Sequence, residues 1–219
     1  MRTDIVINWL AQQGQSLSDK QLSQLAQYQQ MVLTAPMNLT AITDDEDFAI
    51  KHFIDSLTLL PWIDKLDSSA KIMDLGTGAG FPGIPLKIAR PSLDITLLDS
   101  LLKRVNFLRS ATEALGLEGV ECIHARAEDY ARQNGSCYDL VIARAVAKLS
   151  KLAEYALPLV KPGGTFLAMK GPHVTDEIKD AKPIMDKLGG VVEDVVPIDI
   201  SQGITHTVMV IKRHKSLQL

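Results

Sequence analysis

The stretch Asp74-Leu-Gly-Thr-Gly-Ala-Gly-Phe-Pro-Gly83 decides the fold of this chain. A short apolar run, residues 71–73, precedes it and is predicted to be a strand, and residues 84–90 follow with helical spacing. A strand, a glycine-rich turn and a helix start in this order predict a site for a nucleotide-like cofactor, because the first N–H groups of the helix lack intrahelical partners. Three glycines permit positive φ and leave room for a ligand against the backbone: Gly76, Gly78 and Gly80.

The spacing of these glycines excludes two common nucleotide sites. A dinucleotide site requires a small residue at the third position of G-x-G-x-x-G/A, where this chain has Phe81. A Walker phosphate loop ends in Gly-Lys-Ser/Thr, which the stretch lacks. The remaining pattern, Asp-x-Gly-x-Gly-x-Gly, resembles the first motif of Rossmann-like methyltransferases that use S-adenosylmethionine. A glycine-rich turn without a ligand is the less favoured alternative, because the segments that follow agree with a cofactor site.

Acidic residues follow the next two predicted strands. Asp99 ends the strand at 93–98, and a carboxylate at this place accepts hydrogen bonds from a ribose diol. After the strand at 120–124, Glu128 or Asp129 is expected to accept from the exocyclic amine of adenine. Taken alone, Glu128 is better explained as a solvated carboxylate favoured by the dipole of a helix first turn. Together with the glycine turn and Asp99, the cofactor interpretation is preferred.

Length and composition allow one large α/β domain with a small appendage. The 219 residues are 46% hydrophobic, and turn residues separate the apolar segments at regular intervals. The two cysteines, Cys122 and Cys137, have no metal-ligand spacing and imply no disulfide framework, and Cys122 falls in a strand that is expected to be buried. No run approaches transmembrane length, and no basic segment followed by an apolar core marks the N-terminus. We therefore expect a soluble, cytoplasmic protein without membrane contact.

Residues 1–66 differ in pattern from the rest of the chain. Apolar residues recur there at mostly helical spacing, with many glutamines between them. Ser18 is expected to begin a helix with a capping box, and a further helix is expected over residues 45–60, ended by Pro61. We interpret residues 1–66 as a small N-terminal helical cap and residues 67–219 as a Rossmann-like methyltransferase domain.

After the cap, predicted strands and helices alternate, which indicates parallel strands joined by right-handed crossovers. Ser100 is expected to cap the helix after the second strand, and residues 148–160 and 175–188 are expected to be helical. The last two strands, 191–198 and 205–212, have no helix between them and should pair antiparallel. We predict an α/β fold with a mostly parallel seven-stranded sheet and an antiparallel last strand, as in the Rossmann-like methyltransferases that depend on S-adenosylmethionine. Ligands of such sheets bind at the carboxyl ends of the strands.

The residues after the fourth predicted strand bear on the atom that accepts the methyl group. Amino methyltransferases that act on adenine or glutamine resemble one another in carrying Asn/Asp-Pro-Pro-Tyr/Phe there, whereas this chain has Ala143-Arg-Ala-Val146. Methylation of C5 in a pyrimidine needs a thiolate nucleophile, and neither Cys122 nor Cys137 emerges at the end of a strand. A ring nitrogen with its own lone pair, such as guanine N7, needs neither device, and the enzyme would contribute positioning and desolvation.

Several motifs together point to one family. The most specific is the Phe-Pro-Gly-x-Pro-Leu extension of the turn, within DLGTGAGFPGIPLKI at residues 74–88. The others are Asp99-Ser-Leu-Leu-Lys-Arg-Val-Asn-Phe-Leu108, Arg144-Ala, Lys170-Gly, Asn38-Leu-Thr40 and His52-Phe-Ile-Asp-Ser56. On these motifs, nearly the whole chain resembles the bacterial small-subunit ribosomal RNA guanine-N7 methyltransferase G family, also called glucose-inhibited division protein B. It departs from the family pattern at Leu33-Thr34, Lys51-His52 and Thr205-His206.

The resemblance implies roles for individual residues. Those assigned to the site of S-adenosylmethionine, or of its product S-adenosylhomocysteine, are Asp74, Gly76, Gly78, Gly80, Phe81, Asp99, Ala127, Glu128 and Arg144. Among them Gly78 and Gly80 would shape the turn, and Ala127 and Glu128 would hold the adenine. Arg144 would border both the cofactor and the target base. It is the preferred candidate for contacting the base, because its planar guanidinium can pair with a guanine edge or with phosphate. A structural ion pair at Arg144 is an alternative of comparable weight. Lys170 is a weaker candidate for a phosphate contact, and His52 either touches RNA or is simply packed.

The net charge of −3 argues against a uniformly positive surface but does not exclude RNA, which needs only a local basic face. The candidates for such a face are Lys103, Arg104, Arg109, Arg126, Arg144, Lys148, Lys170 and the run Lys212-Arg-His-Lys215. An ordinary solvated surface explains most of these residues equally well, and a frayed tail explains the final run.

Our leading hypothesis is methyl transfer from S-adenosylmethionine to N7 of a guanine in 16S ribosomal RNA, and the resemblance implies the decoding-region loop of that RNA. The partner would be this RNA, within a small ribosomal subunit or an assembly intermediate. The protein would act as a monomer and without a metal. Two alternatives stay open: a methyltransferase of the same fold that acts on a small molecule or protein, and a ribosome-assembly factor that binds the cofactor without turnover.

Overall fold

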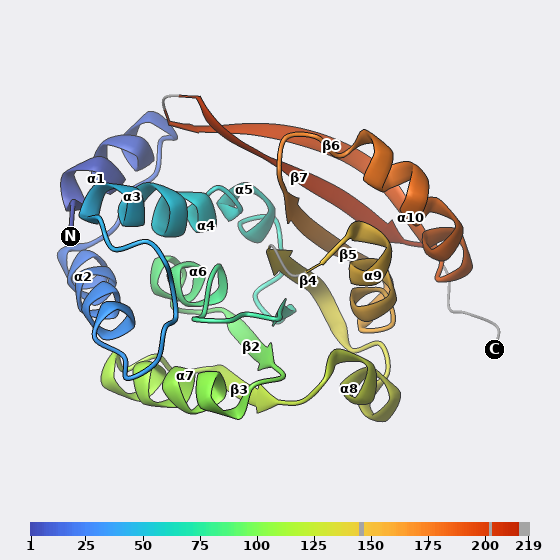
Figure 1. The fold of residues 1–219 in the computed structure, drawn as a ribbon, viewed down its shortest axis with the longest axis horizontal. Helices are drawn as coiled ribbons and strands as arrows, with labels where there is room; N and C mark the ends of the chain where they lie inside the picture. The colour runs from blue at the N-terminus through green and yellow to red at the C-terminus, as the bar shows by residue number, and fades with distance from the viewer. Residues whose placement is uncertain (145–146, 202, 215–219) are drawn as a thin grey trace.

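The computed structural model describes residues 1–144, 147–201 and 203–214, and within them seven strands form one sheet (Figure 1). The strand order is β3-β2-β1-β4-β5-β7-β6. The strands are β1 Lys71–Leu75, β2 Asp94–Asp99, β3 Val120–His124, β4 Tyr138–Arg144, β5 Val160–Lys170, β6 Gly190–Ser201 and β7 Ile204–Arg213. Neighbouring strands are parallel except that β7 is antiparallel to both β5 and β6. The predicted Rossmann-like architecture is confirmed.

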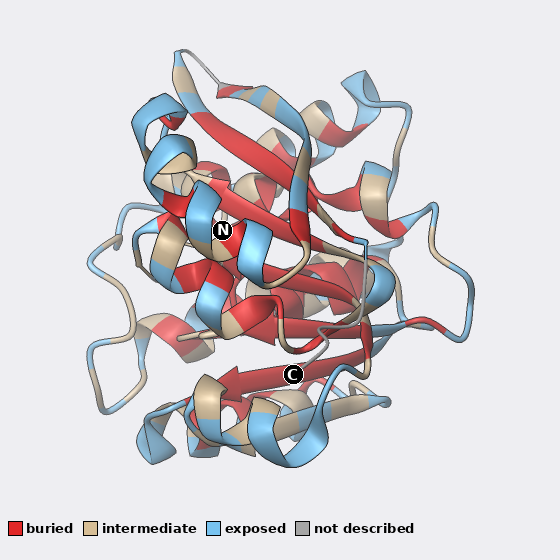
Figure 2. Ribbon diagram, turned by 90° about the vertical axis from the view of Figure 1, so that its right-hand side faces the viewer, coloured by how far each residue is buried: buried red, intermediate tan, exposed pale blue. Residues whose placement is uncertain are grey.

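Helices cover both faces of the sheet, because successive strand residues point to opposite faces. Ile72 of β1 packs into the core on one face, and Met73 packs into the core on the other. The first face is covered by the N-terminal helices together with α6 Gly83–Ala89 and α7 Leu102–Ala114. The second face is covered by α8 Ala127–Asn134, α9 Leu149–Ala156 and α10 Thr175–Lys187. Figure 2 shows the buried strands running between these layers.

Residues 1–66, which we call the cap, are helical and pack on the first face. The elements are α1 Thr3–Gln12, α2 Asp19–Leu33, α3 Asp45–Phe48, a π-helical segment Ala49–Ile54, α4 Asp55–Leu57 and α5 Leu60–Ile63. The predicted capping box is confirmed: the Ser18 side chain accepts from the Gln21 backbone, and the Gln21 side chain accepts from the Ser18 N–H at 2.8 Å. The division into a cap and a sheet domain stays a prediction, because one continuous apolar cluster includes both.

The single helix predicted over residues 45–60 is wrong in its interior and at its end. The chain forms a π-helix from Ala49 to Ile54, and five of these six residues are buried. An amphipathic α-helix would bury only the residues along one face. Pro61 does not end a helix but lies in the first turn of α5, where its missing N–H removes no helical hydrogen bond. The hydrophobic pattern alone could not distinguish these two helical geometries.

Three smaller predictions also need correction. Ser100 does not cap α7, because the neighbouring Asp99 carboxylate accepts from the Leu101 N–H at 2.8 Å and the helix begins at Leu102. The helix expected over residues 148–160 ends at Ala156, and the chain is already paired in β5 from Val160. Strand β3 is an edge strand and is not fully buried, so its Cys122 is only half-buried. Among the described residues, no helix is both long and apolar enough to span a membrane.

Candidate functional site

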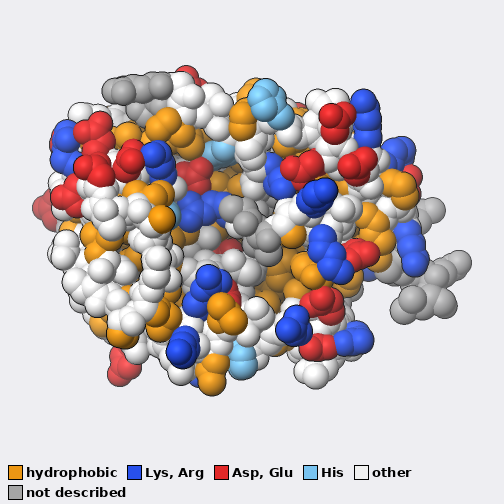
Figure 3. Space-filling model, viewed as in Figure 1, with side chains coloured by type: hydrophobic (Ala, Val, Ile, Leu, Met, Phe, Trp, Pro, Cys, Tyr) orange, Lys and Arg blue, Asp and Glu red, His pale blue; other side chains and the backbone are white. Residues whose placement is uncertain are grey.

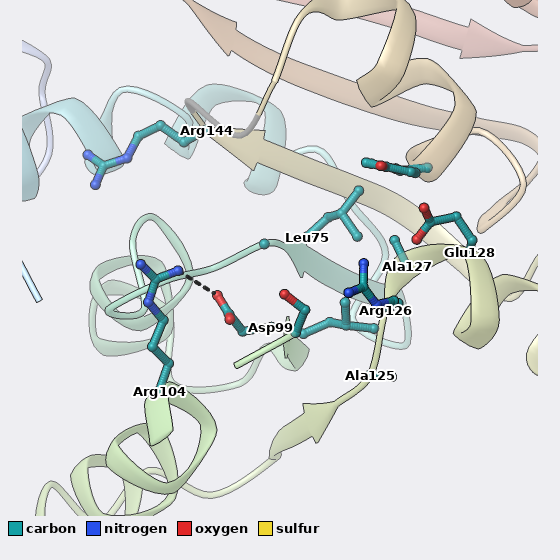
Figure 4. Close-up of a pocket in the computed structure, with 12 residues that line it drawn as sticks. Leu75, Asp99, Arg104, Ala125, Arg126, Ala127, Glu128 and Arg144 are labelled. Carbon is teal, nitrogen blue, oxygen red and sulfur yellow. Dashed lines mark hydrogen bonds and ion pairs between the residues drawn. The ribbon is translucent and has the colours of Figure 1, made fainter. Parts of the chain in front are cut away.

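A cavity of about 300 Å³ lies at the carboxyl ends of β1, β2, β3 and β4 (Figure 4). This is the edge at which the sequence places its glycine turn and its acidic residues. The lining residues are Leu75, Gly76, Leu98, Asp99, Ser100, Arg104, Ala125, Arg126, Ala127, Glu128, Arg144 and Tyr155. Segments far apart in the chain therefore meet here because their strands are parallel neighbours in the sheet.

Asp74 holds the glycine turn together from inside. Its Oδ2 accepts from the Thr77 hydroxyl at 2.6 Å and from the Gly83 N–H at 2.8 Å, which joins the two ends of the turn. The side chain is fully buried and does not line the cavity. Burial raises the pKa of the Asp74 carboxyl to about 6, although both hydrogen bonds oppose this rise. The placement supports a role in shaping the turn rather than the direct cofactor contact that was predicted for Asp74.

Asp99 connects the turn to the second strand. Its Oδ2 accepts from the Gly78 N–H at 2.9 Å and lies 3.5 Å from the Arg104 guanidinium, while its Oδ1 accepts from the Leu101 N–H. Only 3% of the Asp99 side chain is exposed. The carboxylate is thus held on the cavity wall in one orientation, with Oδ1 retaining a lone pair for a further donor.

Gly78 and Gly80 have different surroundings although both have positive φ, 61° and 92°. A Cβ atom added to Gly78 would meet nothing within 4 Å, so the backbone is open to an approaching molecule beside Asp99. A Cβ added to Gly80 would instead collide with side chains that pack behind the turn, including Tyr28 of the cap. Tyr28 is buried there, and its hydroxyl donates to the Ala79 carbonyl. Gly80 therefore serves packing rather than ligand approach.

The cavity is also lined by Ala127 and Glu128 at the start of α8 and by Tyr155 of α9. Figure 4 shows the Glu128 carboxylate beside an aromatic ring, a pairing that offers an acceptor and an apolar face to a flat heterocycle. The sequence interpretation missed Tyr155, because a tyrosine within an amphipathic helix carries no signal of its own. It also missed Ser100 and treated Arg104 and Arg126 only as surface charges.

Arg144 lies at the opposite end of the cavity from Glu128 (Figure 4). Its guanidinium donates to Asp55 Oδ2 at 2.8 Å and to the Lys51 carbonyl at 3.1 Å, and it lies over the ring of Phe81, 5.3 Å from the centroid. The ion-pair alternative for Arg144 is therefore present together with its position at the cavity. Phe81 is 4% exposed and does not itself line the cavity.

His52 is buried beside Arg144 and stacks on Phe81, with ring centroids 4.4 Å apart and planes inclined by 11°. Burial, with a further effect of the Arg144 charge, lowers the pKa of His52 to about 3. The ring is therefore neutral near pH 7, so that Nδ1 accepts from Arg144 Nη2 at 3.3 Å and Nε2–H donates to the Thr40 hydroxyl at 2.8 Å.

Lys170 and the described part of the basic run, residues 212–214, do not line the cavity. The Lys170 ammonium donates to the Ala147 carbonyl at 2.8 Å and pairs with Glu177 at 2.8 Å, contacts that do not support the predicted phosphate contact. Arg213 is buried and donates to the Leu157 carbonyl at 2.8 Å. Lys215 lies outside the described residues, as do Ala145 and Val146 of the motif after β4. In the described ranges, no cluster of three or more metal-ligating side chains occurs.

A model of the GidB family, described as rRNA small subunit methyltransferase G, matches residues 21–204. The chain belongs to this family. Its relatives include the proteins named ribosomal RNA small subunit methyltransferase G from Clostridium novyi and from Lactobacillus delbrueckii subsp. bulgaricus. The first is 44% identical over 204 residues, which cover 91% of this chain and 84% of the relative. The second is 52% identical over 157 residues, covering 70% and 66%.

Solved structures are similar to this GidB-family chain in fold alone. A SAM dependent methyltransferase from Aquifex aeolicus superposes with a TM-score of 0.57 at 19% identity, covering 78% of this chain and 94% of the other. M. jannaschii TYW2, solved in complex with AdoMet, gives a TM-score of 0.57 at 17% identity, covering 73% and 74%. Sequence relatives thus establish the family, and these structures agree with its Rossmann-like architecture.

Proposed function

We propose that this chain transfers a methyl group from S-adenosylmethionine to N7 of a guanine in 16S ribosomal RNA, in the decoding-region loop. The observation that carries the proposal is the cavity at the glycine turn in a chain that belongs to the rRNA small subunit methyltransferase G family. A fold shared with many methyltransferases would not by itself favour RNA over other acceptors.

The residues of the cavity fit an adenosyl group. Its volume of about 300 Å³ is within the range of small-molecule sites, and its two ends differ in chemistry. The Asp99 carboxylate suits a ribose diol, and Glu128 with Ala127 and Tyr155 suits an adenine. The open backbone at Gly78 admits the middle of such a ligand. S-adenosylmethionine supplies a methyl group that its sulfonium already activates, so the chain has to orient the acceptor and exclude water.

A large acceptor is supported by the surface beside the cavity. Leu101 and Leu102, at the start of α7, are 51% and 49% exposed next to the lining residue Ser100. Large apolar side chains exposed together at the edge of a site are typical of macromolecular contacts. Lys103 follows them, and Figure 3 shows Lys and Arg side chains scattered around the hollow of this face, with acidic ones between them. This face offers both charge for phosphates and apolar surface for unstacked bases.

The acceptor atom follows from what the cavity offers and from what its described residues lack. No thiol lines the cavity among the described residues, so the covalent route to C5 of a pyrimidine is not favoured. Guanine N7 attacks through its own lone pair and loses no proton, so it requires no general base. Arg144 is then the side chain best placed to hold the acceptor, on the guanine O6 or on a phosphate.

The test is transfer of a labelled methyl group from S-adenosylmethionine to small subunits isolated from cells that lack the protein. The expected product is N7-methylguanine at one site of the decoding-region loop, mapped by chemical cleavage at N7-methylguanine and primer extension. Unchanged N7-methylguanine at that loop in the deletion cells would refute the substrate. A label that resists RNase would favour a protein or small-molecule acceptor. Cofactor binding without single-turnover transfer would favour an assembly factor.

The proposal includes the form of the substrate. We infer that a monomer acts in the cytoplasm on the assembled subunit or a late intermediate, because the exposed face is only modestly basic and would gain from shape as well as charge. Comparison of naked 16S RNA with intact subunits under the same assay separates these substrates. A higher rate on naked RNA would contradict this part of the proposal.

A further inference from the structure

Arg144 lines the cavity, and its guanidinium is anchored by three residues of the cap. Both hydrogens of its Nη1 are used, one to Asp55 Oδ2 at 2.8 Å and one to the Lys51 carbonyl at 3.1 Å. One hydrogen of Nη2 is used by His52 Nδ1 at 3.3 Å. A guanidinium has five N–H donors, so within the described residues the Nε–H and one Nη2–H stay available. The anchor thus leaves at most two donors for a ligand.

Asp55 also contacts a third element, at ion-pair distance and without a well-aligned hydrogen bond. Its Oδ1 lies 2.7 Å from Nδ1 of His206, which belongs to β7, while its Oδ2 faces Arg144 of β4. The Asp55 and His206 side chains are only 13% and 10% exposed. Burial alone would raise the pKa of the Asp55 carboxyl, but His206 and Arg144 outweigh burial and lower it, so the carboxylate is ionised at neutral pH. Two of the three contacts to the Arg144 guanidinium come from the side chains of Asp55 and His52, which are held in place by the residues packed around them.

The chemistry of guanine makes the orientation of this arginine matter. An arginine that reads guanine ordinarily donates to O6 and N7 together. A donor on N7 would occupy the lone pair that must attack the methyl carbon. A productive complex therefore needs Arg144 to contact O6 or a phosphate while N7 stays free. An arginine that was free to rotate into the cavity would bind guanine through both O6 and N7 and would thereby block methylation of N7.

We propose that Asp55, held by His206, is a positioning residue that turns the Nη1 edge of Arg144 toward the cap and so keeps the arginine from masking N7 of the target guanine. This inference rests on the proposed function, because it concerns the base that is methylated. Asp55 does not line the cavity, so it acts through Arg144 and not on the cofactor.

The test is a double-mutant cycle between Asp55→Asn and Arg144→Ala, with kcat, subunit affinity and cofactor affinity measured separately. Asp55→Asn is expected to lower kcat about 10- to 100-fold, because Arg144 would be misplaced relative to the target guanine. Subunits should bind as tightly as before or more tightly. In the Arg144→Ala background, Asp55→Asn should change kcat less than about twofold, because the residue it positions is gone. A merely structural Asp55 would instead lower stability and affinity in both backgrounds.

Two further variants separate positioning from folding. His206→Asn keeps a donor near Asp55 Oδ1 and is expected to retain activity, whereas His206→Leu should behave like Asp55→Asn. The matched control is Asp64→Asn, which removes another contact between the cap and the sheet domain, the Arg90–Asp64 pair at 2.6 Å. This pair lies outside the cavity, so kcat should be unchanged.

The anchor also has a readout that needs no activity. The guanidinium signals of Arg144 in ¹⁵N NMR, assigned with Arg144→Lys, should show restricted rotation in the wild type and free rotation in Asp55→Asn. Unchanged restricted rotation in Asp55→Asn, or a kcat loss that simply adds to that of Arg144→Ala, overturns the inference. If wild-type protein transfers no methyl group to subunits, the proposed function fails, and the NMR result alone decides whether Asp55 anchors Arg144.

Discussion

Alanine at Gly80 should mainly destabilise the fold and alanine at Gly78 should mainly impair cofactor binding, although the two glycines are two residues apart in one turn. At Gly80 (φ 92°) a Cβ would lie closer than 3.0 Å to three side chains, those of Tyr28, Ile84 and Leu108. At Gly78 (φ 61°) it would meet nothing within 4 Å. The first change should therefore destabilise the fold, and the second should mainly block the space above the turn.

The magnitudes follow from two separate costs. A side chain in the left-handed region costs about 1–2 kcal/mol. Overpacking of a buried site costs a further 1–3 kcal/mol or so. Gly80→Ala incurs both and should lower the free energy of unfolding by about 2–5 kcal/mol, whereas Gly78→Ala incurs only the first. Because the collision at Gly80 includes the Tyr28 hydroxyl, Tyr28→Phe combined with Gly80→Ala should cost less than the two single changes added together.

Urea unfolding gives the stability of each variant, and calorimetry with S-adenosylhomocysteine gives the affinity of the cofactor site. We expect Gly78→Ala to remain folded and to lose at least about tenfold in affinity, since its Cβ would occupy the approach to the backbone beside Asp99. Unaltered affinity in a folded Gly78→Ala variant would refute the placement of the ligand over this turn. A Gly80→Ala variant as stable as the wild type would refute the packing argument.

Three further predictions concern the site and its rim. Burial raises the pKa of Asp74 from 3.8 to about 6, so its stabilising contribution is complete only well below pH 3.8 and is lost as the pH rises through 6; urea unfolding should show the wild type losing about 2.5 kcal/mol relative to Asp74→Asn between pH 4 and pH 7. Replacing Leu101 and Leu102 by serine should weaken binding of small subunits several-fold and leave cofactor affinity unchanged, which filter binding and calorimetry would check. Tyr155→Ala should weaken cofactor binding by about 1 kcal/mol or more, measured by the same calorimetry, and an unchanged affinity would remove Tyr155 from the adenine end.

Local patterns predicted the parts of this molecule that depend on short stretches of chain. Glycine spacing located the turn between β1 and α6, and alternation of strands and helices predicted the parallel sheet with its reversed last strand. Because the strands are parallel, the carboxyl ends of β1, β2 and β3 had to meet, and Gly76, Asp99 and Glu128 do line one cavity. These inferences needed only the period of the side chains and the geometry of parallel crossovers.

The remaining features depend on contacts that no local pattern encodes. The Arg144–Asp55 pair joins residues 89 positions apart, and His206 enters from a strand later still. The π-helical segment that carries His52 has the same apolar residues as an α-helix would have, and only packing against the sheet distinguishes them. For Asp74, sequence alone could not tell a carboxylate that faces a ligand from one that closes a turn from behind.

The cap is better regarded as part of the site than as an appendage to it. Tyr28 holds the Ala79 carbonyl inside the glycine turn, and Asp55 holds the arginine that borders the cavity. Gln21 adds a third link, because its amide donates to the carbonyls of Ile88 and Ala89 at the end of α6, at 2.8 Å and 3.0 Å. The Tyr28 link pairs the buried Ala79 carbonyl, and a buried carbonyl left unpaired costs about 1–3 kcal/mol. The glycine turn and Arg144 are thus both positioned by helices that precede the sheet in the chain, so changes at Tyr28 or Asp55 are expected to alter catalysis without touching the cavity wall.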